Sequence, residues 1–139
     1  MEEDKIVAEL HKINAQFYYA FENLSMEKMD RLWKHGEDVI CIHPGWDLFT
    51  GWFAIRESWI TIFHNTQRIR FIITNTKIRI FDNMAVVVCL ENIETLVNGQ
   101  TIRVGVMATN IFEQNQNKWL LVHHHGSSVS NYMPPNTSL

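Results

Sequence analysis

The sequence predicts an α+β domain in which three N-terminal helices pack on one face of an antiparallel sheet. Three observations support this class. The chain has 139 residues, the size of one ordinary domain. Apolar residues recur at helical spacing through its first half. Its second half consists of β-like runs separated by turn signals.

Two helices are predicted first. Over residues 4–24, the apolar positions are three or four residues apart and trace one face of a helix. These positions are Ile6, Leu10, Ile13, Phe17, Phe21 and Leu24. Ser25 is a good N-cap for a second, short helix, which Gly36 ends.

A buried strand and a third helix follow. Residues 38–43 contain the apolar run 39–42 and are closed by Pro44 and Gly45, as expected of a short buried strand that ends in a turn. The helix is predicted over 52–63, where Trp52, Ile55, Trp59, Ile62 and Phe63 share a face.

Four strands are predicted in the second half, over residues 68–81, 84–97, 100–113 and 118–126. The pair Asn98-Gly99 is the strongest of the intervening turn signals, because this dipeptide favours a two-residue hairpin turn. The remaining residues, 129–139, are rich in Ser, Asn and Pro and are predicted to form a loosely ordered tail.

The hairpin turn fixes which side chains share a face. If Asn98-Gly99 forms the turn, Val97 faces Gln100, and Glu91 lies opposite Val106. One face then carries Val87, Cys89, Glu91, Ala108, Asn110, Val122 and His124. The other carries Thr109, Ile111, Trp119, Leu121, His123 and His125. A single β-bulge would exchange these sets.

The face that helices would not cover is also apolar. It is predicted to hold Val86, Val88, Leu90, Ile111, Trp119 and Leu121. An apolar patch of this kind is typical of a partner surface, so we expect a homodimer formed through the open sheet.

Composition excludes several classes. The chain has 12 Lys and Arg against 15 Asp and Glu, without the basic excess of a nucleic-acid binder. No apolar stretch is long enough to cross a membrane, and the acidic N-terminus does not resemble a signal peptide, so a cytoplasmic location is expected. The two cysteines, Cys41 and Cys89, lie in apolar runs typical of buried free thiols.

Aromatic residues are abundant, at 12% of the chain, and are accompanied by seven histidines. Rings with polar edges suit the walls of small-molecule pockets, so part of the core is predicted to line a cavity.

The last strands allow a family resemblance to be recognised. Trp119, Val122, His123, His125 and Ser127 resemble a strand of the association domains of calcium/calmodulin-dependent kinases. The turn at His43-Pro44-Gly45 and the helix after Gly51 resemble SnoaL-like polyketide cyclases. Both groups belong to the nuclear transport factor 2-like superfamily, which also includes ketosteroid isomerases.

The resemblance implies one nuclear transport factor 2-like domain over residues 1–128, with a sheet that curls into a cone around the helices. It supports no particular reaction, because this fold hosts isomerases, cyclases, dehydratases and assembly domains. The kinase association domains carry basic pocket residues where this chain has Asn110 and Gly126. The acid–tyrosine–acid trio of ketosteroid isomerases has no counterpart that can be placed here.

Three residues are candidates for catalysis. Glu91 interrupts an apolar strand, and burial there would make it a base; alternatively it reaches solvent or pairs with Arg103. His124 faces the same space and could act as acid, base or ligand contact. His43 is predicted at the mouth of the pocket.

Five more residues are candidates for ligand binding. Asn110 could orient a ligand or Glu91, or make a purely structural hydrogen bond. Trp46, Trp59, Tyr18 and Phe63 could form aromatic walls, although core packing explains Trp59 equally well.

No metal site and no cofactor are predicted. His123 and His125 share a face but lack the further ligands that zinc requires, so interface histidines are the favoured interpretation. Neither a nucleophile motif nor a nucleotide-binding loop is present.

The leading functional prediction is a homodimer that binds a small, mostly apolar ligand in the cone. If it is catalytic, we expect cofactor-independent proton transfer of the isomerase, cyclase or dehydratase type, with Glu91 or His124 as base. The alternative is a non-catalytic ligand-sensing or assembly domain.

Overall fold

A computed structural model describes residues 1–135 and shows three helices and a six-stranded sheet. The helices are α1 (Glu2–Glu22), α2 (Met26–Leu32) and α3 (Trp52–His64). The strands are β1 (Ile40–Ile42), β2 (Phe49–Thr50), β3 (Ile69–Phe81), β4 (Met84–Val97), β5 (Gln100–Asn115) and β6 (Lys118–Ser128). The predicted α+β class and its three N-terminal helices are confirmed.

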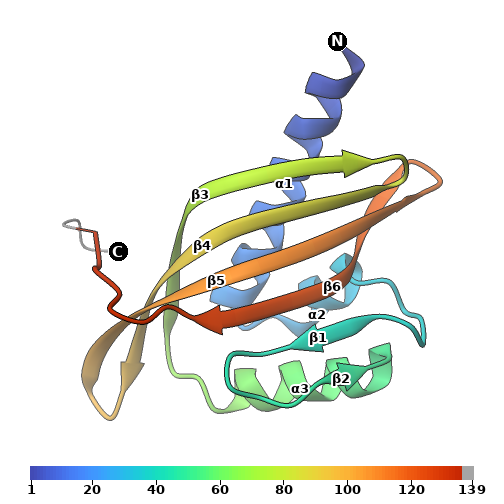
Figure 1. Ribbon diagram of the computed structural model, residues 1–139. Coiled ribbons are helices and arrows are strands. Elements are labelled where there is room, and N and C mark those ends of the chain that lie inside the picture. The colour runs from blue at the N-terminus through green and yellow to red at the C-terminus, as the bar shows by residue number, and fades with distance from the viewer. Residues whose placement is uncertain (136–139) are drawn as a thin grey trace.

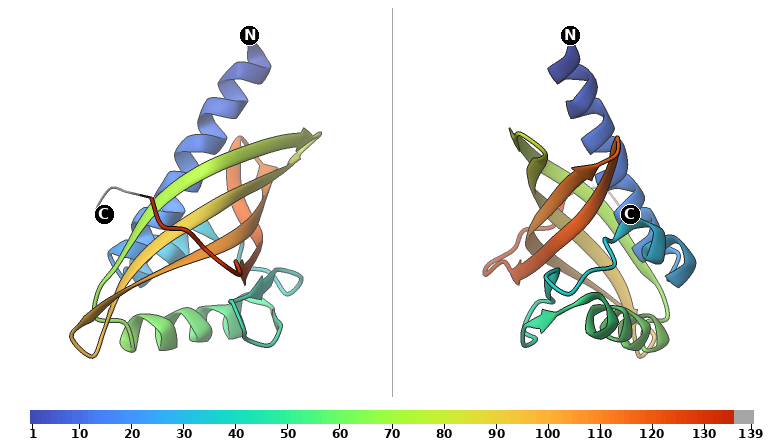
Figure 2. Two further views of the ribbon diagram at one scale, coloured as in Figure 1. Left: turned by 60° about the vertical axis from the view of Figure 1, so that its left-hand side comes forward. Right: turned by 90° about the vertical axis from the view of Figure 1, so that its right-hand side faces the viewer.

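The sheet has the strand order β2-β1-β6-β5-β4-β3, and its four long strands form the predicted meander. Figure 1 shows these strands side by side, with α1 behind them and α3 below. In Figure 2 the long strands bend around α1, whose N-terminal end extends beyond the sheet. The bending creates a concave inner face that holds the core.

The helix boundaries follow from local chemistry. Ser25 caps α2 as predicted, because its Oγ accepts a hydrogen bond from the backbone N–H of Lys28 at 3.1 Å. On α1, Leu10 and Phe17 are fully buried against the sheet, as the apolar periodicity predicts.

The predicted β4–β5 register is confirmed. Val97 pairs with Gln100, and Glu91 pairs with Val106. Asn98 and Gly99 both have positive φ values, 51° and 79°, as a type I′ hairpin turn requires. The turn therefore determines that Glu91 lies on the inner face.

The register between β5 and β6 differs from the prediction. A β-bulge between Ile111 and Phe112 places Phe112 opposite Leu121, whereas Leu120 was expected there. Trp119 and Leu121, predicted on the open face, are therefore buried in the core, with 4% and 0% exposure. Beyond the bulge, His124 lies inside, and His123 and His125 lie outside as predicted.

Two short strands complete the sheet in a way that the sequence did not predict. The strand expected over 38–43 is confined to β1, which pairs in parallel with β6. β2 pairs with β1 and forms the sheet edge. A short apolar run does not specify its partner strand, so the sequence did not predict this parallel pairing.

Part of the predicted tail packs on the outer face. The Tyr132 hydroxyl donates a hydrogen bond to Asn92 Oδ1 at 2.5 Å, and its ring covers Gly105, where a Cβ would collide with it. Residues 136–139 of the tail lie outside the described residues.

Candidate functional site

Four side chains predicted as site residues meet on the inner face of the sheet. Tyr18 comes from α1, Glu91 from β4, Asn110 from β5 and His124 from β6. Each is at most 3% exposed. We call these four residues the inner network.

The hydrogen bonds of the inner network all point the same way, with each donor followed by its acceptor from His124 at one end to Glu91 at the other. Asn110 Oδ1 and His124 Nδ1 are 2.5 Å apart, and Asn110 Nδ2 donates to the Tyr18 hydroxyl at 3.1 Å. Tyr18 in turn donates to Glu91 Oε2 at 2.5 Å. Because Asn110 Oδ1 only accepts, His124 Nδ1 carries the proton, and Nε2 of the neutral ring is an acceptor without a hydrogen-bond partner among residues 1–135.

Glu91 is the acidic end of the inner network. Burial raises the pKa of its carboxyl to about 7, although the hydrogen bond from Tyr18 opposes part of this shift. The alternative pairing with Arg103 is ruled out, because Arg103 Nε contacts Glu94 Oε2 at 3.1 Å. Glu91 is thus a buried carboxyl group that can exchange a proton near neutral pH.

His124 lies at the other end of the inner network from Glu91. Burial lowers its pKa well below the ordinary value, and the neighbouring imidazoles of His43 and two further histidines act in the same direction. His124 is therefore neutral at physiological pH, and its Nε2 is a hydrogen-bond acceptor.

His43 lies beside the inner network but is buried, at 3% exposure, rather than at an open mouth. Its ring centroid is 6.4 Å from that of His124. Ser58 Oγ donates to the backbone carbonyl of Ile55 at 2.6 Å, so it accepts from His43 Nε2–H at 2.9 Å. Burial lowers the pKa of His43 to about 4, and its ring is neutral.

The predicted aromatic residues differ in position. Trp59 is fully buried, and its ring centroid lies 4.7 Å from His43 and 5.9 Å from His124. Phe63 is 8% exposed and packs against Trp59. Trp46 is 42% exposed and lies against the rings of His43 and Phe49, so it lies at the outer end of the group.

One polar atom among these rings has no partner. The indole Nε1 of Trp59 is buried and donates no hydrogen bond within residues 1–135. An unpaired buried donor costs about 1–3 kcal/mol. The indole Nε1 atoms of Trp33 and Trp119 are likewise buried without a partner in that part of the chain.

Sequence reasoning missed two polar residues of the interior. Asn14 Oδ1 accepts a hydrogen bond from Asn110 Nδ2 at 2.9 Å, and Ser58 contacts His43. Each has a sequence signal: Asn14 is four residues before Tyr18 on α1, and Ser58 is three residues after Ile55 within the apolar stripe of α3.

The two outer histidines, His123 and His125, lie near each other on the outer face of the sheet. The rings of His123 and His125 are 6.4 Å apart. Within residues 1–135, no three His, Cys, Asp or Glu side chains are grouped so that they could hold a metal ion. In the same part of the chain, no helix is long and apolar enough to cross a membrane.

Comparison with known proteins adds the family. A model of the SnoaL-like domain matches residues 10–131, which is most of the chain. The chain belongs to the SnoaL-like domain family. Its similarity to solved structures places this SnoaL-like domain in the nuclear transport factor 2-like superfamily, with the cone fold that the resemblance implied.

Two solved structures illustrate the range of relatives. A protein from Streptomyces avermitilis, provisionally named a dehydratase of this superfamily, is 30% identical with a TM-score of 0.85; the match covers 91% of this chain and 98% of that one. A provisionally named calcium/calmodulin-dependent protein kinase II association domain from Thiobacillus denitrificans is 25% identical with a TM-score of 0.77, over 85% and 93% of the two chains.

A curated relative is longer than this SnoaL-like domain. The F-box protein SKIP8 of Arabidopsis thaliana is 30% identical over 115 residues. The match covers 83% of this chain and 47% of that protein, so this chain spans about half the length of its relative.

Proposed function

We propose that the cone interior binds a small, mostly apolar molecule bearing a carbonyl or hydroxyl group and transfers a proton within it without a cofactor. Isomerase, cyclase and dehydratase reactions are all of this type. The observation that carries the proposal is the buried Glu91 carboxyl at the end of the one-directional inner network, with its pKa near 7. The dehydratase name of the relative from Streptomyces avermitilis is consistent with this class.

The contacts support a separate role for each residue. Tyr18 occupies Glu91 Oε2, which leaves Oε1 as the oxygen that takes the proton. Protonated Glu91 can return that proton to another carbon, which gives isomerisation, or to a departing hydroxyl group, which gives dehydration. Either sequence leaves the enzyme unchanged and needs no oxidant.

Asn110 is better described as a positioning residue. Its Nδ2 group already donates to Asn14 and Tyr18, and its Oδ1 already accepts from His124. The free indole N–H of Trp59 is the better candidate to polarise the oxygen of the ligand, because the Nε2–H of His43 is bonded to Ser58. His124, with its free Nε2, is a second candidate base.

Hydrogen–deuterium exchange tests this proposal without a known product. A panel of small ketones and β-hydroxyketones is incubated with the protein in D₂O, and loss of the α-proton signal is followed by NMR. We expect exchange of at least one compound, and Glu91→Gln should slow it by about 10²-fold or more.

Glu94→Gln is the matched control, because Glu94 lies on the same strand, pairs with Arg103 and should keep the wild-type rate. Equal exchange by wild type and Glu91→Gln would contradict the role of Glu91. No exchange with any compound between pH 6 and 9 would reject catalysis in favour of the second candidate function.

The second candidate is an assembly domain that forms a homodimer through the open sheet face. The outer face carries Val86, Val88, Leu90 and Ile111, all partly exposed, and Met107, which is 42% exposed. Relatives named as kinase association domains, including the hub from S. rosetta, share the fold. Such an apolar face favours a partner surface.

Light scattering at micromolar concentration should give twice the chain mass of 16.4 kDa. Val88→Lys should yield monomers, because an ammonium group would be buried without a partner. Ile60→Lys, on α3 at a position that is 36% exposed, should remain dimeric. A strict monomer in the wild type would contradict the dimer.

A further inference from the structure

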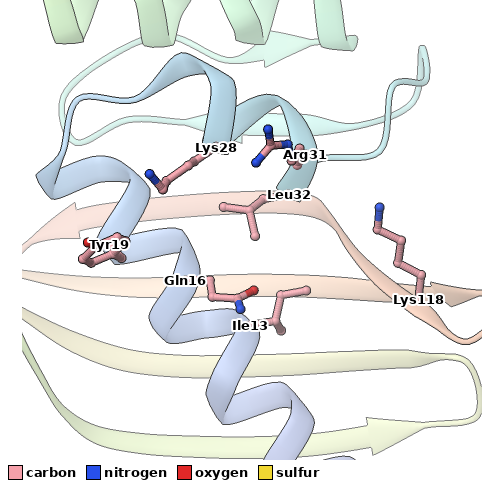
Figure 3. Close-up of a pocket in the computed structure, with 7 residues that line it drawn as sticks. All are labelled: Ile13, Gln16, Tyr19, Lys28, Arg31, Leu32 and Lys118. Carbon is pink, nitrogen blue, oxygen red and sulfur yellow. The ribbon is translucent and has the colours of Figure 1, made fainter.

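A surface groove of about 480 Å³ lies outside the cone, between α1, α2 and the start of β6. No residue of the inner network lines it. Figure 3 shows that its lining comes from all three elements, with Gln16 and Ile13 on α1, Leu32 on α2 and Lys118 on β6. Its volume is within the range of sites for small molecules.

The groove has an apolar floor. Leu32 is 7% exposed and Ile13 is half-buried, so both present aliphatic surface to the hollow. The Tyr19 ring is 57% exposed at one end of the groove. An apolar body that settled here would remove this aliphatic and aromatic surface from water, which is favourable.

The rim is cationic. Lys28, Arg31 and Lys118 line the groove, and no carboxylate is among its lining residues. The guanidinium of Arg31 pairs with Glu27 at 2.5 Å, whereas Lys28 and Lys118 form no ion pair within residues 1–135. Lys28 Nζ instead lies 5.7 Å from the centroid of the Tyr19 ring. Two ammonium groups without an ion-pair partner among the described residues therefore lie at the rim of the groove, in a chain of net charge −3.

We propose that this groove binds a small amphipathic carboxylate, with its apolar body on Ile13, Leu32 and Tyr19 and its carboxylate on an ammonium group of the rim, Lys28 or Lys118. Charge complementarity favours an anion over a neutral ligand, because each ammonium can form a charge-assisted hydrogen bond to a carboxylate oxygen. The site is separate from the inner network and does not depend on catalysis there.

Titration with sodium octanoate, followed by ¹H–¹⁵N NMR, tests the site on the full chain. We expect saturable shifts at the amides of Ile13, Gln16 and Leu32. The double variant Lys28→Gln/Lys118→Gln should bind about fivefold to tenfold more weakly, as expected for two exposed charge contacts. Raising the salt concentration should weaken wild-type binding in the same direction.

The matched control is Lys12→Gln/Lys77→Gln, which removes two exposed lysines that do not line the groove and should bind octanoate as the wild type does. Equal binding of 1-octanol would overturn the proposal, because the groove would then be merely apolar. Amide shifts centred on Glu91 and Asn110 would also overturn the proposal, because they would place octanoate in the cone. The absence of any saturable shift at millimolar octanoate would overturn it as well.

Discussion

Replacing Asn110 by alanine is expected to lower the free energy of unfolding by about 3–5 kcal/mol, since several buried polar groups lose their partner at once. Asn110 is fully buried and joins Asn14, Tyr18 and His124. Alanine would leave the Nδ1–H of His124 and the Oδ1 of Asn14 unpaired in an apolar surrounding. Urea denaturation measures the loss as a shift of the midpoint at constant slope.

Asn115→Ala is the control for this experiment. Asn115 lies on the same strand, β5, but is exposed, so its replacement should change the free energy of unfolding by less than about 0.5 kcal/mol. Similar midpoints for Asn110→Ala and Asn115→Ala would show that the inner network contributes nothing to stability.

Glu91→Gln is expected to stabilise the protein at alkaline pH. The folded state raises the pKa of this carboxyl from 4.5 to about 7, so the folded protein loses stability as pH rises through this window. The two pKa values correspond to a cost of about 3 kcal/mol once Glu91 is ionised. Glutamine keeps an acceptor for the Tyr18 hydroxyl but carries no charge.

The stability difference between Glu91→Gln and wild type should therefore be small near pH 4.5 and grow to about 3 kcal/mol above pH 7. Denaturation curves at a series of pH values measure it. Asn115→Ala, which removes no ionisable group from an exposed position on β5, should show no such growth with pH. A difference that is independent of pH would mean that Glu91 ionises in the folded protein as it does in water.

The buried histidines change the stability with pH in the opposite sense to Glu91, and they do not mask the effect of Glu91→Gln. His43 and His124 have lowered pKa values, so their contribution is present above the ordinary value of 6.5 and is lost as pH falls below it. Both residues remain in Glu91→Gln. Comparing that variant with wild type at each pH cancels their contribution as long as the two sites titrate independently.

Local signals in the sequence predicted much of the fold. The Asn98-Gly99 turn fixed the register of β4 and β5, because a two-residue hairpin leaves no freedom in pairing. The bulge beside Phe112 has no comparable signal, since inserting one residue leaves the apolar pattern of β5 and β6 almost unchanged. Trp119 and Leu121 were therefore assigned to the wrong face.

The sequence predicted the strand residues of the candidate site but not its helix residue Asn14, for a related reason. Glu91, Asn110 and His124 were found because strand alternation assigns each polar residue to a face. Asn14 lies beside the main apolar stripe of α1, and its spacing of four residues from Tyr18 places it on that side of the helix without showing which residue its amide contacts. The hydrogen bonds that give Asn110 its positioning role join residues far apart in sequence, so no local pattern shows them.

Direct titration of the Glu91 carboxyl tests the central claim, that the fold holds this group as a proton acceptor near neutral pH. The ¹³C chemical shift of its side-chain carboxyl carbon is followed by NMR in the full chain, with Glu91→Gln to assign the signal. The structure predicts a midpoint at about pH 7. A midpoint near 4.5 would contradict the claim, because it would mean that Glu91 is solvated and ionised at neutral pH.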